Sequence, residues 1–337
     1  MESNTIDIAV AIIFFNRPDS LKKVFEAIRA SRPSTLFLIQ DGARNDKPSD
    51  AAKVEECRKV VSNIDWPCNV TRLYRKENRG VAYNIYSGIT EAFEIVDKLV
   101  IIEDDIIIDP SFLPFCKTML EKYADDERVF AITGMNHIGE YKKCPYSYFF
   151  SDIGSCWGWA TWKQSWMKME FDSSFLEDHY AVNCFLNSKI RTKMQRKAII
   201  RDSEKRRKAL AEGRRITGWA HQFMTSQYMN NGLWIVPQTN LISNIGLSEE
   251  SVHAANNIKF IPSGLKTVFF GKRTPMTFPL SHPKYMICDY EYSSMVLRVL
   301  GEGFVNKVVR KLETYFRFIV FSNLEQKKDK LLKLFKK

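Results

Sequence analysis

The chain has 337 residues, of which 45% are hydrophobic and 13% aromatic, so it carries enough apolar material for one large core or two moderate ones. Its formal net charge of +11 gathers in two segments, residues 189–215 and 304–337, and the remainder is mildly acidic. The seven cysteines are scattered without a C-x-x-C pair, which favours free thiols in a reducing compartment. No apolar run reaches the roughly eighteen residues of a membrane span, so we expect a cytoplasmic protein.

The first part of the chain alternates short β-branched runs with amphipathic stretches, a pattern typical of βα units on a parallel sheet. The strands predicted from these runs are 8–15, 35–40, 69–74, 98–103 and 129–133. Helical periodicity predicts helices at 19–31, 48–63 and 80–96. The first helix has Pro18 and Asp19 at its start, residue types that suit a first helical turn.

The second part is less regular. Residues 141–170 are rich in aromatic side chains and are interpreted as irregular structure. A polar helical segment is predicted at 174–213, with a strongly basic second half, followed by a helix at 219–231 that ends at Asn-Asn-Gly. A short strand, LWIVP, follows it. Two terminal helices are predicted near 285–300 and at 304–321.

Charged residues follow three of the predicted strands. Phe15-Asn16-Arg17-Pro18 follows the first, Gln40-Asp41-Gly42 ends the second, and Glu103-Asp104-Asp105 ends the fourth. Ligands of open parallel α/β sheets bind outside the carboxyl ends of the strands, so these residues are the first candidates for a site.

The acidic triplet predicts a metal. Three consecutive acids after a buried strand repel one another unless a cation neutralises them, and Mg²⁺ or Mn²⁺ prefers such oxygen ligands. Magnesium uses one or two carboxylates and completes its shell with phosphates and water, which suits a nucleotide diphosphate. The alternative is a helix N-terminus with acids in its first turn. Asp41 before Gly42 is also consistent with a simple turn.

The segments AVAIIFFNRPDSLKKVFEAIRASRPSTLFLIQDG, ENRGVAYNIYSGITEAF and KLVIIEDDIIIDPSFLPFCKTML resemble the nucleotide-sugar domain of GT-A fold glycosyltransferases. The branch they resemble is that of N-acetylglucosaminyltransferase I and its bacterial relatives. The resemblance covers residues 6–170, including FFSDIGSCWGWATWKQSW, and continues more loosely to about residue 253. It implies a mostly parallel central α/β sheet, Rossmann-like, flanked by helices.

The resemblance also implies roles for single residues. Arg17 would contact the nucleotide, Asp41 would accept from the uracil ring, and Asp105 would bind the metal directly. Glu103 and Asp104 would lie toward the ribose and the donor sugar. The implied organisation is a nucleotide-sugar-binding half at 1–140, an acceptor half of the same domain at 141–260, and a helical C-terminal extension at 261–337.

Three further residues are candidates for donor binding. Arg79 stands at a helix entry, where an anion can bind, although an ordinary glycine-containing helix start explains Asn78-Arg79-Gly80 equally well. Trp157 and Trp159 are predicted near the donor or acceptor sugar. The helical spacing of Trp159, Trp162 and Trp166 indicates that at least two of these three belong to the core.

Two histidines are candidates for the chemistry itself. His253 stands where relatives often carry a histidine near the metal, although a loop histidine can also be incidental. The resemblance expects Trp-Asp at 219–220, with the aspartate as general base, but this chain has Ala220 there. His221 is therefore the candidate base. The carboxylates held in reserve are Glu212, Asp202 and Glu204.

The C-terminal segment 304–320 carries an apolar stripe at helical spacing with Lys and Arg beside it, followed by a lysine-rich tail. Such a helix fits peripheral binding to an anionic membrane surface on the cytoplasmic side, but packing against the catalytic domain explains the stripe equally well. The basic run 189–215 fits a solvated helix or an anionic acceptor. No nucleic-acid-binding motif accompanies it, so nucleic acid is not an expected partner.

The sequence thus predicts a metal-dependent, inverting glycosyltransferase that uses a nucleotide-sugar donor, with UDP expected, and a glycan or lipid-linked glycan acceptor in surface polysaccharide synthesis. One alternative is a sugar nucleotidyltransferase, although that chemistry needs a glycine-rich loop after the first strand, where Phe15-Asn16-Arg17-Pro18 has no glycine. Another is a non-catalytic nucleotide-sugar-binding module, favoured by Ala220.

Overall fold

The apolar runs of the first part form neighbouring parallel strands. A computed structural model describes residues 5–190, 193–246, 262, 266, 268–269, 271–300 and 304–321. Its strands β1 (Ile6–Phe14), β2 (Pro33–Gln40), β3 (Asn69–Tyr74) and β4 (Lys98–Glu103) pair in parallel in the order β3-β2-β1-β4. β1 is buried from Val10 to Phe14 on both faces, as its nearly continuous apolar run predicts.

Four more strands continue the same sheet in the order β8 (Trp159–Trp162), β6 (Val129–Thr133), β9 (Leu233–Pro237) and β7 (Tyr148–Ser151). β8 is antiparallel to β4 and β6, β7 is antiparallel to β9, and the others run in the direction of β4. The interpretation of 141–170 as irregular was therefore wrong for 148–151 and 159–166. All residues of β7 and β8 are buried, so neither strand shows the polar alternation that would have marked it.

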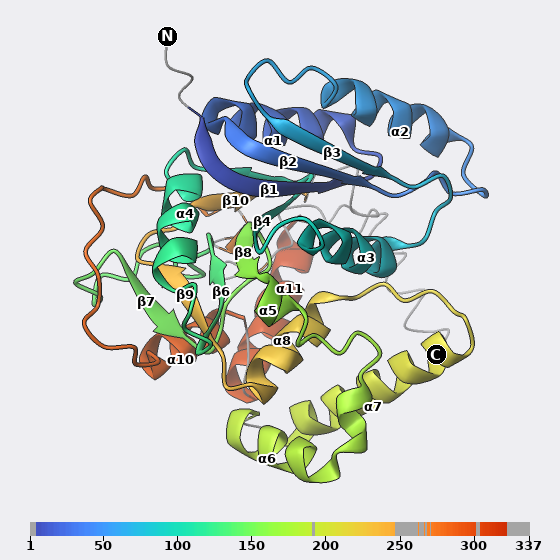
Figure 1. The fold of residues 1–337 in the computed structure, drawn as a ribbon. Helices are drawn as coiled ribbons and strands as arrows, with labels where there is room; N and C mark the ends of the chain where they lie inside the picture. Colours follow the sequence, from blue (N-terminus) through green and yellow to red (C-terminus); the bar gives the residue numbers. More distant parts are fainter. Residues whose placement is uncertain are drawn as a thin grey trace.

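Helices cover both faces of this mixed, mostly parallel sheet, which confirms the predicted Rossmann-like α/β architecture (Figure 1). One apolar core contains side chains of α1 (Pro18–Ser31), α2 (Ser49–Val60) and α4 (Phe112–Lys122). The core on the other face contains side chains of α3 (Val81–Phe93), α5 (Lys163–Trp166), α8 (Ala220–Met229) and α10 (Tyr290–Val299).

A small second sheet lies directly after β4. Its strands, β5 (Ile106–Ile108) and β10 (Ile242–Asn244), are antiparallel and pair Ile108 with Ile242. Backbone hydrogen bonds extend the pairing: Asp109 N donates to Leu241 O and Ile245 N donates to Asp105 O, each at 2.8 Å. This two-stranded ribbon fixes the backbone of Asp105 at the edge of the large sheet.

The predicted helical segment 174–213 is a 3₁₀ turn, η1 (Ser174–Glu177), followed by α6 (His179–Lys189) and α7 (Lys193–Ala211). Asp178 caps α6 by accepting from Ala181 N at 2.9 Å. α10 begins later than predicted because Asp289 caps it, accepting from Tyr292 N at 2.8 Å.

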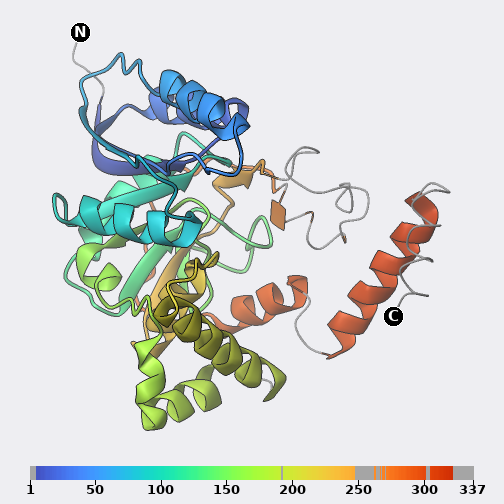
Figure 2. The same cartoon turned by 90° about the vertical axis from the view of Figure 1, so that its right-hand side faces the viewer.

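Helix α11 (Phe304–Phe321) has the predicted bounds and stands away from the central sheet (Figure 2). In the part of the chain that the structure describes, no helix is long and apolar enough to cross a membrane.

Candidate functional site

The carboxyl ends of β2, β1 and β4 meet at one edge of the sheet because these strands are parallel neighbours. Ligands of α/β sheets bind at such an edge. The turn after β1 carries Arg17, the turn after β2 carries Asp41, and β4 ends in Glu103, followed by two aspartates. The edge thus collects the polar residues that the sequence singled out.

Arg17 joins the turn after β1 to the turn after β4. Its Nη1 donates to Asp105 Oδ2 at 2.9 Å and to Asp104 Oδ1 at 3.3 Å. The other oxygen of Asp104 accepts from Phe15 N at 3.2 Å. Asp104 is buried, whereas Arg17 is exposed and Asp105 partly so. The structure therefore brings three predicted site residues into one cluster that reaches solvent, and Asp105 is its accessible carboxylate.

The carboxyl groups of this cluster are costly to keep ionised. Burial, followed by repulsion from Asp105 and Asp104, raises the pKa of Glu103 to about 8. Burial also raises the pKa of Asp104 to about 6, although the charge of Arg17 opposes this. A bound cation would lower both pKa values, because it stabilises the ionised carboxylates. The electrostatics of this edge therefore favour cation binding.

The donor set fits a cation that shares its ligands with a substrate. Among the described residues, no group of three or more His, Cys, Asp and Glu side chains is arranged to hold a metal ion by itself. Mg²⁺ and Mn²⁺ do not require one, because carboxylates, water and substrate phosphates together fill their octahedral shell. Asp105, with its exposed surface, suits a site of this shared kind.

Asp41 has a structural role in this conformation. Its carboxylate accepts four hydrogen bonds: from Gly42 N at 3.0 Å, Asn78 Nδ2 at 3.0 Å, Arg79 N at 2.8 Å and Gly80 N at 2.9 Å. The side chain is buried and holds the loop before α3 against the end of β2. A uracil ring would have to displace one of these donors, so direct contact between Asp41 and a nucleotide stays a prediction.

Two exposed arginines stand beside this loop. Arg79 has its guanidinium carbon 5.9 Å from the centre of the Tyr83 ring. Arg215 donates from Nη1 to Asn78 Oδ1 and from Nη2 to Asn78 O, both at 2.8 Å. Sequence reasoning missed Arg215, because its basic surroundings marked only a charged segment and nothing local placed it beside Asn78. Together the two side chains make the rim of this edge attractive to phosphate.

The two candidate tryptophans have different environments. Trp159 has no exposed surface and stacks on Trp219, with ring centroids 5.8 Å apart. The prediction that Trp159 contacts a sugar was therefore wrong, because a fully buried side chain has no face to offer. Trp157 is partly exposed and packs against Phe269 at 5.0 Å between centroids. Its contact with a sugar stays a prediction.

The candidate base and its reserves lie in the second part of the chain. His221 is exposed on the first turn of α8, next to the partly buried Ala220. Two of the reserve carboxylates are held by arginines: Asp202 by Arg201 at 2.9 Å, and Glu212 by Arg214 at 2.6 Å. Exposed ion pairs of this kind are weak and do not decide which residue is the base, so the role of His221 stays a prediction.

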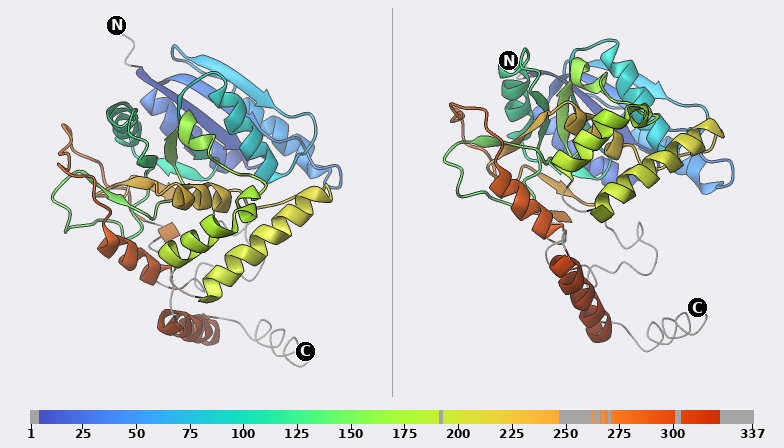
Figure 3. Two further views of the ribbon diagram at one scale, coloured as in Figure 1. Left: turned by 60° about the horizontal axis from the view of Figure 1, so that its bottom comes forward. Right: turned by 90° about the horizontal axis from the view of Figure 1, so that it is seen from below.

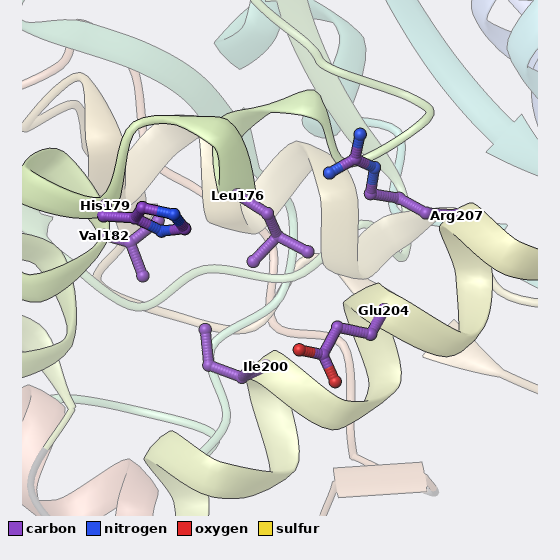
Figure 4. Close-up of a pocket in the computed structure, with 6 residues that line it drawn as sticks. All are labelled: Leu176, His179, Val182, Ile200, Glu204 and Arg207. Atoms are coloured by element: carbon purple, nitrogen blue, oxygen red, sulfur yellow. The ribbon is translucent and has the colours of Figure 1, made fainter.

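The third reserve, Glu204, lines a hollow of about 380 Å³ between η1, α6 and α7 (Figure 4). Leu176, Val182 and Ile200 form its apolar part, and His179 and Arg207 complete the lining. This hollow is built from the helical segment alone. The residues of the carboxyl edge do not line it, and a role of Glu204 as the base stays a prediction.

His253, the candidate second metal residue, lies outside the described residues. Gly246, the last described residue before this gap, lies against the carboxylate of Asp105. A Cβ atom placed on Gly246 would come within 2.1 Å of Asp105 Oδ2. The ribbon of β5 and β10 thus brings the backbone before residue 247 into contact with the proposed metal ligand.

Comparisons with known proteins give distant structural likenesses. No protein-family model and no curated protein sequence matches the chain. The mannose-1-phosphate geranyltransferase of Thermus thermophilus aligns at 11% identity and a TM-score of 0.36, covering 72% of this chain and 77% of that one. The inositol-1-phosphate CTP transferase of T. maritima aligns at 9% identity and 0.36, covering 74% and 94%. The UTP-bound UGPase from Acinetobacter baumannii aligns at 8% and 0.33, covering 72% and 90%. At such low scores these likenesses assign no activity to this chain.

Proposed function

We propose that this protein is a metal-dependent, inverting glycosyltransferase that moves a sugar from a nucleotide diphosphate, with UDP as the expected nucleotide, to a glycan or lipid-linked glycan in surface polysaccharide synthesis. One observation carries the proposal: Arg17, Asp104 and Asp105 cluster at the carboxyl edge of the sheet, with Asp105 accessible. A cation would offset the negative charge of the aspartates, and a diphosphate would offset the positive charge of the cation and of Arg17.

In this proposal, the acidic and basic residues of the edge bind different parts of the metal–diphosphate group. Asp105 would hold Mn²⁺ or Mg²⁺, which when bound offsets the charge that develops on the leaving diphosphate. Arg17, Arg79 and Arg215 supply positive charge for the phosphates from three separate turns. Asp41 keeps the turn that carries Arg79 in place.

The acceptor hydroxyl must lose a proton as the new bond forms, so a base has to stand within about 3 Å of it. We assign this role to His221, whose imidazole can accept a proton and is exposed beside Ala220, where the resemblance to GT-A fold enzymes expects an aspartate. His221→Ala should abolish turnover of the donor and leave metal-dependent UDP binding unchanged. Full activity in this variant would make the histidine structural.

Calorimetric titration with UDP tests the central proposal. In the presence of Mn²⁺ the unaltered protein should bind UDP, and Asp105→Ala should weaken binding by about 2–3 kcal/mol, or about 30- to 150-fold, because the bridge between carboxylate and diphosphate is lost. Asp125→Ala is the matched control, since this exposed aspartate precedes β6 at the opposite edge. Equal affinity and equal metal dependence in Asp105→Ala would refute the metal site.

The same protein preparations separate the two other candidate functions. Pyrophosphate release from UTP and a sugar 1-phosphate would assign a nucleotidyltransferase, although the turn Phe15–Pro18 has no glycine-rich loop for a triphosphate. Metal-dependent UDP-sugar binding with neither transfer nor slow donor hydrolysis would assign a non-catalytic module.

A further inference from the structure

Helix α11 exposes a wide apolar face. Seven of its apolar side chains are between 42% and 66% exposed, namely Val308, Val309, Leu312, Tyr315, Phe316, Ile319 and Val320. At about 100° per residue these positions fall within an arc of about 140° on one side of the helix. These exposures show that the domain does not cover this face, so the explanation that the stripe packs against the catalytic domain does not hold for the described structure. In Figure 3 the ribbon of α11 stands away from the helices of the domain.

An exposed apolar face of this width indicates a surface that binds another molecule. Helices of proteins gain most of their stability by burying an apolar face against other parts of the structure. Contiguous exposed apolar surface on a protein commonly marks a binding surface for a protein or a membrane. The question is therefore what covers α11.

The charge of the helix indicates the partner. Residues 304–321 carry four Lys and Arg residues against one acid, a net charge of +3, and the sequence 322–337 carries six Lys residues against two acids. On the helix, Arg310, Lys311 and Arg317 lie off the apolar arc by their spacing. A basic polar side opposite a broad apolar side is the pattern of helices that lie in the interface of an anionic membrane.

A second copy of the chain fits this face less well. The apolar arc covers a wide side of the helix, whereas the seam of a coiled coil is narrower and uses only two apolar positions in every seven residues. A second copy would also bring the same net charge of +3 on its helix to the contact, and like charges oppose association. An anionic lipid surface instead attracts this charge.

We propose that α11 is an interfacial helix that lies on an anionic phospholipid surface, with Leu312 and Phe316 inserted at the boundary of headgroups and acyl chains. The helix lies along the surface, since it is not apolar enough to cross a membrane. This inference does not rest on the proposed transferase activity, because lipid binding needs neither donor nor metal.

Vesicle flotation of the full chain tests the proposal. The protein should float with vesicles of phosphatidylglycerol and phosphatidylcholine in about equal amounts and much less with phosphatidylcholine alone, and added salt should weaken binding. The double variant Leu312→Asn, Phe316→Asn leaves the charge unchanged and should reduce binding about tenfold or more, because the inserted apolar area is lost. Lys311→Gln should reduce binding to the anionic vesicles about fivefold.

Thr314→Asn is the matched control, because Thr314 lies on the opposite side of the same helix. It should bind vesicles as the unaltered chain does. The exposed positions of Leu312 and Phe316 predict that the double variant stays folded, which circular dichroism verifies. Unchanged flotation of the folded double variant would overturn the proposal. A second outcome would also overturn it: the unaltered chain does not bind vesicles, light scattering shows that it is a dimer, and the double variant is a monomer.

Discussion

At the scale of a single residue, the buried carboxylate of Asp50 connects the turn after β1 to the turn after β2 through Asn16 and Arg44. Its carboxylate accepts from Asn16 Nδ2 at 2.8 Å and from Arg44 Nη2 at 2.9 Å. The hydrogen bonds from Arg44, opposed by burial, lower the pKa of Asp50 to about 2. The folded state therefore holds this carboxylate ionised more strongly than the unfolded chain does.

A pH-dependent stability follows from this shift. A depressed folded pKa stabilises the protein above the unfolded value of about 3.9, and this contribution is lost as pH falls from about 4 to about 2. Asp50→Asn should cost about 1–2 kcal/mol at pH 6, allowing for the partly exposed Arg44, and about half as much near pH 3. Urea denaturation at both pH values measures the difference. The exposed Asp125→Asn is the control, and a cost for Asp50→Asn that did not change with pH would contradict the argument.

At the scale of elements, the ribbon of β5 and β10 determines the position of Asp105. Ile245 N donates to Asp105 O at 2.8 Å, and Gly246 leaves room for the carboxylate. A Cβ at residue 246 would meet Asp105 Oδ2 at 2.1 Å, and the end of a flexible side chain can move away at little cost to folding. The ribbon thus couples a backbone position to the proposed metal ligand.

Gly246→Ala should consequently change binding more than stability. We expect metal-dependent UDP affinity to fall about tenfold and the free energy of unfolding to change by less than about 1 kcal/mol, because the displaced carboxylate no longer meets the metal in the same geometry. Gly218→Ala is the control, since nothing lies within 4 Å of a Cβ at that residue. An unaltered UDP affinity in Gly246→Ala would separate Asp105 from the binding site.

At the scale of the whole molecule, the central sheet separates two apolar cores, one on each of its faces. Trp159 and Trp162 on β8 point to opposite faces and belong to different cores. On the α8 side, Trp159 contacts Trp219, Phe223 and Trp234 within an aromatic cluster. This cluster joins β8, β9 and the start of α8, which carries the candidate base.

Trp159→Ala should therefore act on folding. Removing a fully buried tryptophan leaves a cavity and should lower the free energy of unfolding by about 3–5 kcal/mol. Trp157→Ala, at a partly exposed position, should cost clearly less. Chemical denaturation of both variants gives the comparison. Equal costs would mean that Trp159 is not the core residue its burial indicates.

The sequence by itself determined the βα half and the location of the candidate site within it. Strands such as 98–103 and helices such as 19–31 were predictable because their patterns are local. A run of apolar residues indicates a buried strand, and apolar residues that recur about every 3.6 positions indicate a helix. Charged residues at the ends of parallel strands must share an edge, so Arg17 and Asp105 could be expected together before any contact was seen.

Only the tertiary structure decided the rest, because it depends on contacts between distant segments. β8 is buried on both faces, so its pattern does not distinguish a strand from a helix, and its tryptophans were given a helical period. Arg215 reaches Asn78 across 137 residues, a contact that no local signal encodes. The apolar stripe of α11 was visible in the sequence, but whether the domain covers it is a property of the assembled fold.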